Sequence, residues 1–111
     1  LGERLMHGII LRFFVHEADL YGGELLFEWL LEEAKRLGVP GGSAFRAVAG
    51  YGRHGVLHEQ TFFELAGQLP VAVVFVTSAE HADRLLARLS EQGVSLFYAR
   101  SEAEFGVTPG K

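Results

Sequence analysis

The sequence HGIILRFFVH, residues 7–16, alternates as a β-strand does and carries apolar side chains on both of its faces. One set of alternate positions is wholly apolar: Ile9, Leu11, Phe13 and Val15. The other set mixes apolar and polar residues: Ile10, Arg12, Phe14 and His16. A strand with apolar side chains on both faces needs packing partners on both sides of its sheet. This stretch therefore predicts a strand in a sheet that is covered on both faces.

Two helices and three further strands are predicted around it. An apolar stripe at helical spacing predicts a helix over 24–37, which Gly38 and Pro40 end. Capping-box spacing predicts a second helix, with Thr77 as its cap and Glu80 reaching back, that Gly93 ends. The remaining strands are predicted at three places: 43–49, 71–77 and 94–100. The order βαββαβ is that of an α+β, ferredoxin-like domain, an antiparallel sheet with two helices on one face.

Apolar residues on the second face of the sheet predict a homo-oligomer. The strands at 71–77 and 94–100 repeat the pattern of the first strand, with Val74, Val76 and Phe97 opposite their core positions. Two helices on one face leave the other uncovered, so we expect copies of the chain to cover it.

Composition sets the class of protein. The 111 residues carry a formal net charge of -4 and no large basic cluster, so we expect no nucleic-acid partner. The chain has no cysteine, which fits the reducing cytoplasm, and its longest apolar run is too short to span a membrane. We expect one domain over 6–101, with flexible ends at 1–5 and 102–111.

The segment GYGRHG, residues 50–55, is the candidate binding loop. Three glycines in six residues allow close approach to the backbone, and Arg53 adds a planar cationic fork suited to phosphate or carboxylate. Arg12, Arg46 and Arg100 are candidate neighbours in an anion site. The alternative is a hairpin loop whose glycines only make turns.

Other chemistry has less support. His54 and His58, four residues apart and followed by Glu59, have a composition that binds divalent metals, but a histidine pair in a polar loop is more often solvated. There is no nucleophile elbow and no Walker A loop, so we expect no enzyme.

The order of several motifs resembles the PII signal-transduction proteins, which include the nitrogen regulatory proteins. The motifs are Gly38-Val39-Pro40-Gly41, Gly50-Tyr51-Gly52-Arg53 and Leu69-Pro70-Val71. The chain is more similar to the PII-like "domain of unknown function 190". That likeness adds four further pairs and spans about 6–100: Leu11-Arg12, Gly22-Gly23, Phe45-Arg46 and Leu57-His58.

The resemblance implies a homotrimer with its sheets facing inward and an adenine nucleotide between subunits. Residues 53–68 would correspond to the mobile T-loop that touches partner proteins, and Gly50, Tyr51, Gly52 and Arg53 to the nucleotide site at its base. The second phosphate-binding loop of PII is replaced here by SEQGVS, residues 90–95. A nucleotide with few phosphates, such as AMP, therefore fits better than ATP, with ADP between them.

These observations predict a cytoplasmic PII-like regulator that binds a small anionic effector and signals to an unknown partner protein, for which a membrane transporter is one candidate. The alternative is a divalent-metal-binding trimer similar to CutA, with His54, His58 and Glu59 as ligands.

Overall fold

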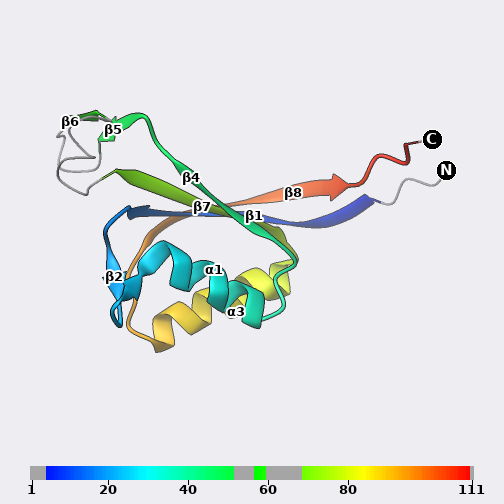
Figure 1. The fold of residues 1–111 in the computed structure, drawn as a ribbon. Helices are drawn as coiled ribbons and strands as arrows, with labels where there is room; N and C mark the ends of the chain where they lie inside the picture. Colours follow the sequence, from blue (N-terminus) through cyan, green and yellow to red (C-terminus); the bar gives the residue numbers. More distant parts are fainter. Residues whose placement is uncertain (1–4, 52–56, 60–68, 111) are drawn as a thin grey trace.

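The computed structural model describes residues 5–51, the backbone of 57–59, and residues 69–110. Its main sheet contains β1 (Leu5–His16), β4 (Gly42–Arg46), β7 (Pro70–Thr77) and β8 (Phe97–Gly106). The strand order is β4-β7-β1-β8, and every neighbouring pair is antiparallel. Helices α1 (Leu26–Arg36) and α3 (Ala79–Glu91) lie together on one face of this sheet (Figure 1). The ferredoxin-like prediction is therefore confirmed.

The core lies between the sheet and the two helices. Leu11 and Phe13 of β1 pair with Phe75 and Val73 of β7, and all four side chains are fully or almost fully buried. The rings of Phe13 and Phe75 meet edge to face, with centroids 6.1 Å apart. Each such side chain contributes about 1.5–3 kcal/mol by leaving water. We call this face of the sheet the helix side.

Helix α1 begins two residues later than predicted, because the segment before it forms a hairpin. Strands β2 (Leu20–Tyr21) and β3 (Glu24–Leu25) pair across Gly22 and Gly23, whose φ angles are 59° and 84°. Two consecutive residues with positive φ define the tight turn that suits such a hairpin. At its other end α1 stops as predicted, with Gly38 at φ 95°.

Helix α3 is capped by Ser78, so the prediction of Thr77 was wrong by one residue. The Ser78 hydroxyl accepts a hydrogen bond of 3.0 Å from the backbone N–H of His81. Thr77 is instead the buried last residue of β7. The strand ends at Thr77 as predicted, and the residue after it supplies the cap.

A buried carboxylate joins the two helices. Glu33 of α1 accepts hydrogen bonds from Arg36, at 2.6 and 3.2 Å, and from Arg88 of α3, at 2.7 Å. Donation from Arg36 is the largest cause that lowers the pKa of Glu33 to about 2, and Arg88 lowers it further against the effect of burial. The helices are thus held to each other as well as to the sheet.

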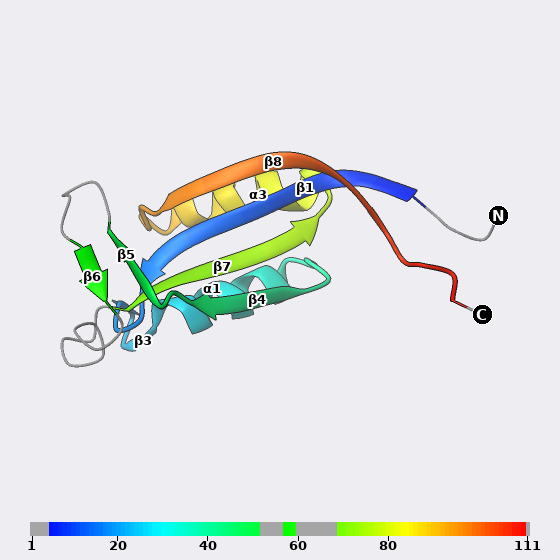
Figure 2. The same ribbon diagram turned by 90° about the horizontal axis from the view of Figure 1, so that it is seen from above.

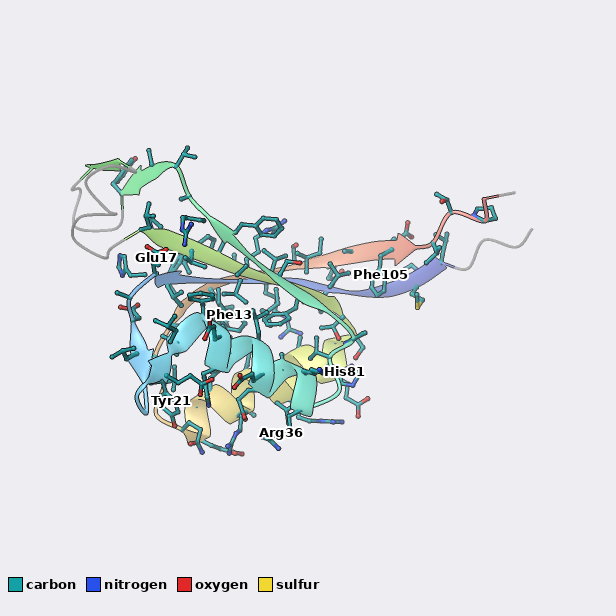
Figure 3. All side chains as sticks on the ribbon, viewed as in Figure 1. Phe13, Glu17, Tyr21, Arg36, His81 and Phe105 are labelled. Carbon is teal, nitrogen blue, oxygen red and sulfur yellow. The ribbon has the colours of Figure 1, made fainter. Side chains whose placement is uncertain are left out.

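The last strand is longer than predicted, and the expectation of a flexible end from residue 102 was wrong for 102–106. Strand β8 runs to Gly106, and Ala103–Gly106 pair with Leu5–Gly8 of β1 beyond the end of β7. We call this two-stranded extension the ribbon (Figure 2). A Cβ atom on Gly8 would clash with the carbonyl oxygen of Thr77 and lie 2.7 Å from the ring of Phe105. Phe105 is labelled on β8 in Figure 3. The close packing requires glycine at position 8.

The face of the sheet away from the helices, which we call the open side, has no cover from the described part of the chain (Figure 1). Register and alternation place the following residues on it: Ile10, Arg12, Phe14, Phe45, Ala72, Val74, Val76, Phe97 and Ala99. Phe97 is 75% exposed and Phe14 41% exposed, with their ring centroids 5.7 Å apart. The apolar second face is therefore real, whereas its cover by other copies stays a prediction.

In the segments that the structure describes, neither helix combines the length and apolar character needed to cross a bilayer.

Candidate functional site

The candidate loop extends from one end of the sheet as a short stem (Figures 1 and 2). The chain leaves the sheet after β4 and forms β5 (Ala49–Tyr51), which pairs with β6 (Leu57–Glu59) before the chain returns into β7. Gly50 lies opposite His58 in this ladder, and Tyr51 opposite Leu57. The glycine-rich motif therefore begins on a strand of the stem.

Backbone hydrogen bonds fix the base of the stem where the chain leaves and where it returns. The N–H of Ala47 donates to the carbonyl of Pro70 at 2.8 Å, and the N–H of Glu17 donates to the carbonyl of Leu69 at 2.7 Å. Leu69 itself is buried. The stem thus starts from a defined platform made by the ends of β1, β4 and β7.

Arg46 lies at this platform and already holds a carboxylate. Its guanidinium donates through Nη2 to Oε1 of Glu17, which directly follows β1 and is labelled in Figure 3. The Arg46 side chain is about half exposed, and Glu17 is the more buried partner. An anion that reached Arg46 would have to compete with Glu17 for the same donors.

Arg100 lies on the other edge of the sheet and is also paired. It stands opposite Leu11 on the helix side of β8, and its Nη1 donates to Oδ1 of Asp83 on α3 at 2.7 Å. Because β4 and β8 are the two outer strands and the register offsets the two residues by four positions, strand spacing and rise put Arg46 and Arg100 roughly 20 Å apart. Arg12 is on the open side, so one chain does not bring the three arginines together.

Gly50 does not need to be glycine for the chain's own conformation. Its φ is not positive, and among the described atoms a Cβ built on it would meet only Pro70 Cγ, at an ordinary 3.8 Å. A turn with positive φ therefore does not explain this glycine. Close approach by a group beyond the described residues stays a hypothesis for it. Tyr51, next to it, is 73% exposed.

The structure does not describe the side chains of the other predicted ligands. Gly52, Arg53 and His54 fall outside the described residues, and for His58 and Glu59 only the backbone is described. Among the side chains that are described, no three His, Asp or Glu gather as a metal site would require.

The segment that replaces the second phosphate loop borders an uncharged hollow. A cavity of about 470 Å³ lies between the end of α3 and the start of β8. Ser90, Ser95 and Tyr98 supply its polar groups, and apolar side chains and Gly93 complete it; none of its described lining residues is charged. It offers hydroxyl donors to a ligand but no cation to a triphosphate.

Sequence reasoning missed two features. The Glu17–Arg46 pair joins residues 29 apart in the chain, and no local pattern signals it. The lack of a carboxylate beside Arg12 emerges only from the register, which places Val74 and Ala99 at its sides.

Comparison with known families and relatives agrees with this fold. The model of the family DUF190 (uncharacterized ACR, COG1993) matches residues 8–96. A UPF0166 protein of Aquifex aeolicus is 34% identical over 86 residues, which cover 78% of this chain and 82% of that protein. A UPF0166 protein of Methanocaldococcus jannaschii is 34% identical over 82 residues, covering 74% and 75%.

Solved structures of PII-like proteins share the fold at low sequence identity. A putative PII-like signaling protein from Thermus thermophilus has a TM-score of 0.63 and 23% identity, covering 91% of this chain and 90% of that one. CPII from Thiomonas intermedia K12, described as bound to ADP and bicarbonate, has a TM-score of 0.62 and 17% identity, covering 94% and 91%. A second CPII structure is described as bound to ADP, AMP and bicarbonate, with a TM-score of 0.60 and 15% identity, covering 95% and 97%. The chain belongs to the DUF190 family, with a PII-like fold.

Proposed function

We propose that this chain is a cytoplasmic PII-like regulator rather than an enzyme, and that it works as a homotrimer. It binds a small anionic effector, an adenine nucleotide such as AMP, in the clefts between chains. Binding orders the segment 53–68 and changes its affinity for a partner protein, with a membrane transporter as the candidate.

The observation that carries this proposal is the position of the arginines at the two sheet edges. Arg46 is on the outer strand β4 beside the glycine stem, and Arg100 is on the opposite outer strand β8. A single chain keeps them roughly 20 Å apart. A ring of chains that brings one edge of the sheet near the other edge of its neighbour supplies both arginines to one cleft.

The chemistry favours a nucleotide with few phosphates. The hollow beside residues 90–95 has hydroxyl groups and apolar walls but no charged side chain. The chain also has a net charge of -4, which opposes the binding of a highly charged anion. Both points favour AMP over ATP, and the PII-like CPII structures described with ADP and AMP support the same ligand class.

The Glu17–Arg46 pair provides a way for the effector to act on the stem. An anion that takes the Arg46 donors releases Glu17, whose backbone N–H holds the returning chain at Leu69. A ligand shifts a conformational equilibrium only when it binds the two states unequally. Because the effector competes with the Glu17 carboxylate for Arg46, it binds the state without the Glu17–Arg46 pair more tightly than the state with it. Glu17→Gln should therefore tighten effector binding.

Isothermal titration calorimetry with AMP, ADP and ATP tests the proposal. We expect saturable heat, strongest with AMP, which Arg53→Ala weakens without disrupting the assembly. Arg84→Ala, on the exposed face of α3 where Arg84 pairs with Glu80 at 3.4 Å, is the matched control and should bind normally. Absence of heat with all three nucleotides at millimolar concentration contradicts the nucleotide proposal.

A further inference from the structure

Arg12 differs from every other arginine that the structure describes. Arg36 and Arg88 pair with Glu33, Arg46 with Glu17, Arg84 with Glu80, and Arg100 with Asp83: each of these five guanidiniums has a carboxylate within 3.4 Å. Within the described residues, Arg12 has no ion pair and no side-chain hydrogen bond. Among the described arginines, Arg12 is therefore the one whose donors remain available to a partner from outside the described part of the chain.

The surroundings of Arg12 explain why no described carboxylate reaches it. It lies on the inner strand β1, on the open side of the sheet, between Val74 of β7 and Ala99 of β8. Ile10 and Phe14 precede and follow it on the same face of β1. On the four strands, every other described position of the open side is apolar, small, hydroxyl-bearing or histidine, and none is Asp or Glu.

A second copy of this chain is the cover that fits the open side. The open side extends along the length of β1, from the ribbon to the end beside the stem, so it is long, and it is mainly apolar. Strand spacing and rise give it roughly 600 Å² in projection, close to the roughly 800 Å² of accessible surface that each partner buries in a stable interface. The same face of another copy has equal length and the same apolar character.

Such an interface creates an electrostatic problem. Each copy brings one guanidinium near the centre of the open side, and these faces bring no carboxylate. Burying charge without a counter-charge is strongly unfavourable, and two like charges in one interface add repulsion. The planar guanidinium fork binds the oxygens of phosphate, carbonate or carboxylate through paired hydrogen bonds.

We propose that a small oxyanion, of the size of inorganic phosphate, is bound by Arg12 inside the interface between copies. The inference rests on the assembly in the proposed function, but its site is distinct from the effector cleft. Arg46 lies on the helix side beside the stem, whereas Arg12 lies on the open side at the middle of β1. The oxyanion is part of the assembled structure, and the assembly is tighter when the oxyanion is present.

The test is the dissociation constant of the assembly, measured by sedimentation velocity in sodium phosphate and in sodium chloride at equal ionic strength. For the wild type, phosphate should tighten assembly by roughly tenfold or more, because a ligand bound only by the assembled state stabilises that state. Arg12→Met keeps an apolar side chain and removes the charge, so this variant should assemble tightly in both salts. Arg84→Met removes an arginine from the outer surface and should respond to phosphate as the wild type does.

Each other outcome overturns part of the account. A wild-type monomer in both salts contradicts the proposed assembly itself. Equal assembly in both salts, with dissociation of Arg12→Met, shows that a carboxylate of another copy pairs with Arg12 and overturns the oxyanion site alone. A phosphate response that persists in Arg12→Met places the anion elsewhere. Circular dichroism of Arg12→Met and of a second variant, Arg12→Gln, distinguishes loss of assembly from loss of folding. Calorimetry with AMP on Arg12→Met tests the effector cleft separately.

Discussion

The two faces of the sheet have similar sequence patterns and opposite surroundings. On the helix side Leu11, Phe13 and Val73 are completely buried, whereas on the open side Phe14 and Phe97 remain exposed. Phe13 and Phe14 are neighbours in the chain, and only the alternation of the strand separates their environments. The charges differ too, because Arg46 and Arg100 on the helix side are paired, whereas Arg12 on the open side has no ion pair with any described residue.

The difference indicates that one face completes the fold and the other serves assembly. Burial on the helix side is achieved within the chain, so it should determine whether the chain folds. Apolar area on the open side gains free energy only when another surface covers it. Substitutions on the two faces should therefore change different measurable quantities.

The largest effect on folding should come from Phe13→Ala. Removing a fully buried ring should lower the free energy of unfolding by about 3–5 kcal/mol, measured by urea denaturation. Phe14→Ala is the matched substitution on the other face. It should act through assembly, so that its unfolding midpoint lies below that of the wild type at concentrations where the wild type assembles, and depends less strongly on protein concentration. Equal losses for the two variants at every concentration would remove the distinction between the faces.

The next effect should come from the carboxylate that joins the helices. Because the pKa of Glu33 is lowered to about 2 from 4.5, its contribution is fully present above about pH 4.5 and is lost as the pH falls toward 2. Glu33→Gln should lower the free energy of unfolding by roughly 2–3 kcal/mol at neutral pH, and the difference from wild type should vanish near pH 2. Denaturation at several pH values measures it, and a difference that is independent of pH contradicts the ion-pair explanation.

A smaller effect is expected where the ribbon leaves the sheet. Gly8→Ala places a methyl group against the Thr77 carbonyl and the Phe105 ring, and should cost about 1–3 kcal/mol of folding free energy. Gly41→Ala is the control, since nothing lies within 4 Å of the added atom and its φ is not positive. Thermal denaturation of the two variants compares them, and equal midpoints would show that the ribbon packs less closely than described.

The smallest effect on folding should come from Phe97→Ser on the open side. Phe97 is largely exposed in the single chain, so the substitution should change the free energy of unfolding of that chain by about 0.5 kcal/mol or less. Its assembly should nevertheless weaken by roughly tenfold or more, because an apolar ring is lost from the interface. Sedimentation across a concentration series tests this, and unchanged assembly would exclude Phe97 from the interface.

Much of the fold could be predicted because its signals are local. The alternation of β1, the apolar stripe of α1 and the glycines after both helices depend on neighbouring residues, and they gave the element order. The errors came from partners distant in sequence. Residues 102–106 have no unbroken apolar run and end in a glycine, so they look like a tail, but pairing with residues 5–9 of β1 makes them a strand. Ser78, not Thr77, caps α3, because Thr77 is a buried residue of β7.

The candidate site was less predictable than the fold. The motif at Gly50 located the stem, but nothing local shows that Arg46 is held by Glu17 or Arg100 by Asp83. The glycines and arginines in the sequence indicated an anion site, but the strand order places Arg46 and Arg100 on opposite edges of the sheet. A site shared between chains cannot be read from one sequence, because its geometry depends on how the copies pack.

The most direct test of the central claim, that copies of this chain cover the open side, is sedimentation velocity of the wild-type protein in phosphate buffer at micromolar concentration. The account predicts a species with the mass of three chains, and a lower mass for Phe97→Ser under the same conditions. A wild-type protein that sediments as a monomer would contradict it.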